Sequence, residues 1–75
     1  MRGYVVIFEG DDERGHSAYS TDLPGVVAAG ASRIETERLM RSAMADHILL
    51  LKEAGEAVPE PSDAADVVLL DPAAA

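Results

Sequence analysis

The chain has 75 residues, no cysteine and a formal net charge of −8 at pH 7. A chain of this length forms one domain and buries only about 60% of its unfolded surface, so its stability margin is narrow. Without cysteine it has neither disulfides nor thiolate metal sites, and its excess of carboxylates disfavours direct nucleic-acid binding. The same negative charge is compatible with a basic protein partner, or it serves only to keep the protein soluble.

Small size and few aromatic residues make oligomerisation a natural way to bury more surface, so we expect a homodimer or higher oligomer. No apolar run is long enough to span a membrane, and the first four residues lack the features of a signal peptide. The sequence therefore predicts a soluble, cytoplasmic protein.

Two short segments near the N-terminus predict a β-hairpin. Residues 4–8 are β-branched or aromatic and apolar on both faces, which is typical of a central strand covered on both sides. The charged stretch 9–15 contains two glycines and predicts a hairpin connection. It leads to a weakly patterned second strand over residues 16–20.

Residues 22–25, with the sequence Asp-Leu-Pro-Gly, predict a type II turn. Pro24 presets φ at the second position, and Gly25 accepts the positive φ of the third. A short third strand over residues 26–29 follows the turn. We expect Gly30 to end this strand where the chain bends into a helix.

One long helix gives the clearest signal in the chain. Ser32, followed three residues later by Glu35, predicts a capping box, and Gly55 is placed to end the helix in the left-handed conformation. Residues at three- and four-residue spacing define its apolar face. That face consists of Thr36, Met40, Ala43, Met44, His47, Ile48 and Leu51. Leucines at positions 39, 49 and 50 make this apolar face wider than one small sheet needs. The extra leucines either add to the core or contact a second subunit or a partner.

Residues 56–65 form a proline-containing linker, residues 66–70 predict a fourth strand, and residues 71–75 are expected to fray. The elements follow the order β-β-β-α-β, which indicates a two-layer α+β fold. In the simplest arrangement the first three strands form an antiparallel meander. The fourth strand lies beside the first and parallel to it, giving sheet order 3-2-1-4 with the helix on one face.

This ordered set of features resembles the HicB-like antitoxins of bacterial type II toxin–antitoxin systems. The resemblance covers residues 3–70 and depends on order and spacing: a Tyr-Val-Val strand, an acidic glycine-containing loop, Tyr19 shortly before the turn, and a capped helix followed by Pro-Glu-Pro-Ser. The residues that form its structural motifs are Leu23, Pro24, Gly25, Gly30, Ser32, Glu35 and Gly55.

The resemblance implies a partial ribonuclease-H-like fold and a specific partner. That partner is a small basic mRNA-cleaving toxin of the HicA type, which the antitoxin neutralises by forming a complex. The candidate toxin-binding residues are Glu9, Asp11, Asp12, Glu13 and Tyr19. Many family members continue into a DNA-binding domain. This chain ends at Ala75, either as a naturally short form or as a truncated one, so we expect a single domain over residues 1–75 without direct DNA binding. The alternative is a solitary structural or regulatory interaction domain without a toxin.

The sequence supports a catalytic or metal-binding function less well than it supports the antitoxin function. A two-metal nuclease needs several carboxylates at one point, but Glu9 and Asp66 are expected at opposite edges of the sheet. Residues 11–13 lack the spacing of a calcium-binding loop. His16 is predicted to be an exposed strand residue, and His47 a hydrogen-bonded core or interface residue. We therefore expect no enzymatic activity, cofactor or metal.

Overall fold

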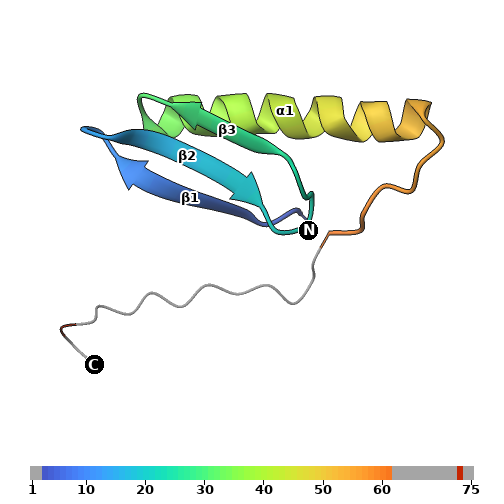
Figure 1. The fold of residues 1–75 in the computed structure, drawn as a ribbon, viewed down its shortest axis with the longest axis horizontal. Coiled ribbons are helices and arrows are strands. Elements are labelled where there is room, and N and C mark those ends of the chain that lie inside the picture. The colour runs from blue at the N-terminus through green and yellow to red at the C-terminus, as the bar shows by residue number, and fades with distance from the viewer. Residues whose placement is uncertain (1–2, 62–72, 74–75) are drawn as a thin grey trace.

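A computed structural model of the protein describes residues 3–61 and residue 73. This part of the chain contains β1 (Val6–Asp11), β2 (Gly15–Ser20), β3 (Val27–Gly30) and α1 (Arg33–Glu53). The strands form an antiparallel sheet in the order β1-β2-β3, and α1 lies along one face (Figure 1). The predicted α+β class is therefore correct. The predicted fourth strand, residues 66–70, lies outside the described residues.

The β1–β2 hairpin extends further than predicted. Residues 9–11 were expected in a loop, but they belong to β1 and pair with residues 15–17 of β2. Only residues 12–14 remain in the turn. The prediction relied on apolar side chains to define the strand, whereas the pairing depends on backbone hydrogen bonds that polar residues make equally well. Glu9 and Asp11 therefore lie in β1, while Asp12 and Glu13 lie in the turn of the hairpin.

β1 begins at Val6, two residues later than predicted. Before Val6, the backbone groups form hydrogen bonds with side chains and not with the backbone of a neighbouring strand. The backbone N–H of Val5 donates to Asp22 Oδ2 at 2.8 Å, and the hydroxyl of Ser20 donates to the carbonyl oxygen of Val5 at 2.8 Å. Ser20 Oγ also accepts from the backbone N–H groups of Asp22 and Leu23, each at 3.1 Å. Buried Ser20 thus joins the start of β1 to the turn after β2.

The predicted turn and third strand are present with small shifts. The backbone N–H of Val26 donates to the carbonyl oxygen of Leu23 at 3.3 Å, and Gly25 has a φ of 86°, as a type II turn requires. β3 then runs to Gly30, one residue beyond the predicted end. Leu23 is fully buried, so this turn also supplies a core residue.

The start of α1 is capped as predicted, with one half of the capping box visible. The backbone N–H of Glu35 donates to Ser32 Oγ at 3.1 Å. Both the N–H and the hydroxyl of Thr36 donate to the carbonyl oxygen of Ser32, at 3.0 and 2.7 Å. A Cβ atom at Gly30 would lie 2.9 Å from Thr36 Oγ1, so the small residue there permits the close approach of helix and strand.

The end of α1 is also as predicted. Gly55 has a φ of 72°, and its N–H donates to the carbonyl oxygen of Lys52 at 3.1 Å. The N–H of Glu56 donates to the carbonyl oxygen of Leu51 at 2.9 Å. These two bonds form the Schellman motif that commonly ends a helix at a glycine.

The core lies between α1 and the sheet, mainly against β2 and β3. Its buried apolar residues are Ala18, Leu23, Val26 and Met40. Thr36 and Met40 are the fully buried members of the predicted helix face, while Ala43, Met44 and Ile48 are half-buried against this cluster. In the described part of the chain β1 forms one edge of the sheet, whereas the prediction placed it centrally with residues 66–70 beside it.

Candidate protein-interaction surface

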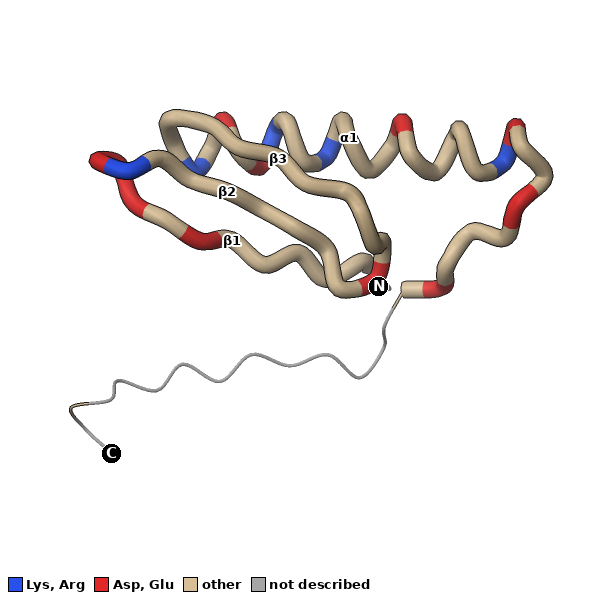
Figure 2. The backbone as a smooth tube through the Cα atoms, viewed as in Figure 1, with Lys and Arg blue, Asp and Glu red and all other residues tan. Residues whose placement is uncertain are grey.

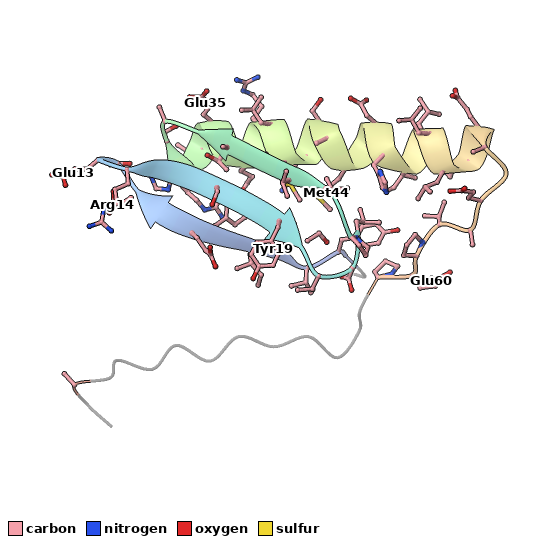
Figure 3. The ribbon with its side chains drawn as sticks, viewed as in Figure 1. Glu13, Arg14, Tyr19, Glu35, Met44 and Glu60 are labelled. Carbon is pink, nitrogen blue, oxygen red and sulfur yellow. The ribbon has the colours of Figure 1, made fainter. Side chains whose placement is uncertain are left out.

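The side of the sheet away from α1 is uncovered in the described structure, and we call it the open face. Strand side chains alternate between the two sides, and in β2 the residues Ser17 and Tyr19 are exposed while Ala18 and Ser20 are buried. Figure 3 shows Tyr19 on the side of the sheet away from the helix. Through the strand register the open face consists of Ile7, Glu9, Ser17, Tyr19, Val27 and Ala29.

Three of these side chains form an apolar row across the sheet. Tyr19 pairs with Ile7 on one side and with Val27 on the other. Tyr19 is 41% exposed and Val27 is 67% exposed, while Ile7 is half-buried. Adjacent exposed apolar side chains are a common feature of protein-binding surfaces, and tyrosine is enriched among the residues that contribute most to binding.

The hairpin next to this row is acidic (Figure 2). The predicted toxin-binding carboxylates gather there, but they do not play equal parts. Asp11 Oδ1 accepts hydrogen bonds from the backbone N–H groups of Glu13 and Arg14, at 3.0 and 2.7 Å, and so holds the turn closed. Asp12 Oδ1 lies 2.8 Å from Nε2 of His16. Asp11 and Asp12 therefore have structural roles in the hairpin.

Glu9 and Glu13 are the better placed candidates for contact with a basic partner. Glu9 is exposed on the open face, in the row next to Tyr19, where it is paired with Ser17. Glu13 is exposed at the tip of the hairpin beside Arg14 (Figure 3). The open face thus combines an apolar row with negative charge at its hairpin end.

The prediction for His16 was wrong. Its side chain is only 13% exposed, because it lies on the helix side of β2, two residues before buried Ala18, and contacts Asp12. The alternation of residues 16, 18 and 20 contained this information, but the weak apolar pattern of β2 concealed it. His47 is half-buried on α1, and it lines a small hollow together with Val27 of β3.

A second candidate surface is a groove of about 590 Å³ between β1 and α1. Five apolar side chains line most of it, and the sequence pattern did not reveal it. They are Val6 and Phe8 of β1 with Met40, Met44 and Ile48 of α1. Tyr4 lies at one end of the groove, and its hydroxyl donates to the carbonyl oxygen of Pro59 at 2.6 Å.

The other end of the groove is bordered by charged residues of α1. The guanidinium of Arg33 lies 3.3 Å from the centre of the Phe8 ring, a cation–π contact. Glu37 accepts hydrogen bonds from Arg33 at 3.0 Å and from Arg41 at 3.3 Å. These two hydrogen bonds lower the pKa of Glu37 from its ordinary value of 4.5. The groove is therefore lined mostly by apolar side chains, together with Glu37 and Arg41 of α1.

Residues 3–61 and 73 contain no group of three or more histidine, cysteine or acidic residues arranged to hold a metal ion. Over the same residues, α1 is the helix present, and it is not apolar enough to cross a membrane. Asp66, which was expected at the other edge of the sheet from Glu9, lies outside the described residues.

The fold and the surface together define a class: a small α+β protein with a three-stranded antiparallel sheet, one covered face and one open face. Comparison with known proteins finds no match to the chain among family models, curated proteins or solved structures.

Proposed function

We propose that this protein is a HicB-like antitoxin that binds and neutralises a small basic mRNA-cleaving toxin of the HicA type. The observation that supports the proposal best is the apolar row of Ile7, Tyr19 and Val27 on the open face, next to the acidic end of the hairpin. The role is that of a binding protein and not of an enzyme. A toxin that cleaves mRNA acts in the cytoplasm, and the antitoxin would act there too.

Binding would combine two physical effects on one surface. Tyr19 and Val27 would be removed from water in the complex, and this burial would supply most of the affinity. Glu9 and Glu13 would attract the basic toxin and accelerate the encounter. Positive charge on the toxin serves RNA binding, so a protein that covers those charges blocks access to RNA.

The proposal includes the complete fold that the resemblance implies. This is the partial ribonuclease-H-like β-β-β-α-β arrangement with sheet order 3-2-1-4, in which residues 66–70 run parallel to β1. The observed order β1-β2-β3 is compatible with it, because the edge of β1 opposite β2 is where the fourth strand would be added.

Self-association is part of the same proposal. Leu49 and Leu50, on the outer side of α1, are 55% and 63% exposed, which suits a contact with a second copy. Light scattering at micromolar concentration should give the mass of a dimer or a higher oligomer. A monomeric mass would contradict this part of the proposal.

Co-expression tests the antitoxin role. The wild-type chain is produced together with the small basic protein encoded by the adjacent reading frame, and growth rescue and co-purification are measured. The double variant Tyr19→Ser with Val27→Ser should lose about tenfold or more in affinity for that protein. Ile34→Ser serves as the control, because it removes an exposed apolar side chain from α1 that the proposal places in neither interface.

Two outcomes would contradict the proposal. If the wild-type chain neither rescues growth nor co-purifies with a basic neighbour, the protein is a solitary interaction domain. If Ile34→Ser weakens binding as much as the open-face variant, the toxin does not bind the open face.

A further inference from the structure

β3 forms an outer edge of the sheet, and this edge lacks the features that usually keep other strands away. Within the described residues β3 pairs only with β2. Proteins commonly protect an edge strand with charged residues or proline, as Glu9 and Asp11 do on β1. Residues 26–31 contain neither a charged residue nor a proline. The outer backbone groups of β3 can therefore pair with an added strand.

α1 turns this edge into a groove. The helix runs alongside β3 and packs mostly against it (Figure 1). A hollow of about 240 Å³ lies between the two elements, and we call the hollow and the adjoining edge the β3 groove. An exposed sheet edge beside a side-chain pocket is the arrangement by which some domains bind an extended peptide as an added strand. The side chains that line the hollow are Val26 and Val27 at the start of β3, with Ala43, Asp46, His47 and Leu50 of α1.

A strand in the β3 groove would contact both sides of the sheet, because its side chains alternate in direction. On the helix side, an apolar side chain would enter the hollow. On the other side, its neighbours would lie beside Val27, which is 67% exposed at the end of the apolar row. β3 has only four residues and offers few backbone hydrogen bonds, so these side-chain contacts would supply much of the affinity.

The charges along the groove favour a basic segment. Asp46 is exposed and lines the hollow. Glu35 lies near the other end of β3, since a Cβ atom at Gly30 would be 3.2 Å from Glu35 Cγ. Arg33 and Arg41 lie on the side of α1 toward β1, away from this groove. A second copy would bring the same carboxylates and its own net charge of −8, so repulsion disfavours it as the occupant.

We propose that the β3 groove binds an extended segment of a basic protein as an added strand. One apolar side chain of that segment fills the hollow, and lysine or arginine side chains lie near Glu35 and Asp46. The groove adjoins the open face at Val27, so one partner can cover both surfaces. The inference rests on the proposed function only for the identity of this partner, which would be the toxin.

A synthetic peptide tests the groove without any toxin. The probe alternates valine and lysine and is about six residues long, the usual length of a strand. Nuclear magnetic resonance of the full chain should show shifts at β3 and at Asp46, and slower amide exchange at every second residue of β3. A matched peptide with glutamate in place of lysine should bind about tenfold more weakly or worse. No binding at millimolar peptide, changes at β1 in place of β3, or equal binding of both peptides would overturn the proposal.

Two variants with the same change in charge test the role of Asp46. Asp46→Lys should weaken binding of the valine–lysine peptide about tenfold, because it places a positive charge at the hollow. Glu56→Lys makes the same change at an exposed position beyond the end of α1 and should have little effect. Circular dichroism confirms that both variants are folded. Equal weakening by the two variants would mean that net charge alone attracts the peptide.

The free protein tests the competing occupant. If β3 amides exchange slowly without peptide, and more slowly at higher protein concentration, a second copy fills the groove and the proposal is wrong. The peptide result is also separate from the co-expression result. Peptide binding without growth rescue would support the groove and contradict the antitoxin function, whereas growth rescue without peptide binding would do the reverse.

Discussion

The two sides of β2 differ sharply, although their residues alternate along one six-residue strand. Toward α1 the strand presents Ala18 and Ser20, both buried, and the small size of Ala18 lets the helix come close. Toward the open face it presents Tyr19, one of only two tyrosines in the chain, with 41% of its surface in water. The described core thus uses small residues while a large aromatic side chain remains outside it.

This contrast suggests that the open face is not simply an unfinished core. In a chain with so few aromatic residues, burying each one adds substantially to stability. Tyr19 also lies in a row with Val27, which is 67% exposed, and next to Glu9, which is charged. A surface that joins exposed apolar and acidic side chains is suited to a partner with the complementary combination.

The largest expected effect comes from the covered side. Met40 is 1% exposed beneath the sheet, and Met40→Ala should lower the free energy of unfolding by about 2–5 kcal/mol. Small domains have about 5 kcal/mol in total, so much of the variant should be unfolded at 37 °C. Urea denaturation followed by circular dichroism measures the change. Ile34→Ala, at an exposed position of the same helix, should change stability by less than about 0.5 kcal/mol. Equal losses for both variants would mean that the two sides are not distinct.

Two serines of β2 make a closer comparison between the sides. Ser20→Ala removes the hydroxyl that bonds to Val5, Asp22 and Leu23, and leaving these backbone groups unpaired should cost about 1–3 kcal/mol. Ser17→Ala, on the open face, should be nearly neutral. Chemical denaturation of both variants under the same conditions gives the difference. A neutral Ser20→Ala would show that water replaces the lost hydrogen bonds.

The negative charge of the open face should affect the rate of association with the toxin more than the affinity of the complex. Glu9→Gln with Glu13→Gln should slow association with the basic toxin several-fold and reduce its dependence on salt, while dissociation changes little. Surface plasmon resonance at several salt concentrations measures both rates. Glu53→Gln with Glu56→Gln removes the same charge at the far end of α1 and serves as the control. If both variants slow association equally, net charge alone steers the encounter.

The smallest expected effect is the contribution of Glu37 to the pH dependence of stability. Hydrogen bonds from Arg33 and Arg41 make the pKa of Glu37 lower in the folded than in the unfolded chain. The stabilisation is therefore fully present above the unfolded value near 4.5, and it is lost as pH falls through the folded value. Because the pair is solvent-exposed, the effect is small. Urea midpoints at pH 7 and pH 3 should differ less for Glu37→Gln than for wild type. Asp46→Asn is the control, and an unchanged pH dependence in Glu37→Gln would contradict the assignment.

Local signals in the sequence predicted much of the fold. The Ser32 cap, the turn at Gly25 and the end of α1 at Gly55 are all where their residues indicate, because each depends on hydrogen bonds or backbone angles within a few residues. The hairpin was predicted too short, and His16 was placed on the wrong side of its strand. Both errors arose where polar residues form strands, since apolar periodicity is then too weak to show the pairing.

Of the candidate interaction surface, the sequence analysis named Tyr19 and the acidic residues, but neither Ile7 nor Val27. Tyr19 is on the open face as the proposal needs, yet Val27 became its neighbour only through the register of β2 with β3. Asp11 and Asp12 looked equivalent to Glu13 in the sequence, and only the structure shows that they hold the hairpin together. The groove beside β1 had no local pattern, because its walls come from segments about 30 residues apart.

The sequence by itself determined where the described strands and the helix begin and end to within a few residues, and the acidic character of the chain. These depend on local preferences and on composition. Only the tertiary structure decided which side of the sheet the helix covers, which carboxylates remain available, and that β1 and α1 leave an apolar groove between them. Such features arise from contacts between residues far apart in the chain, and no short segment contains the information that specifies them.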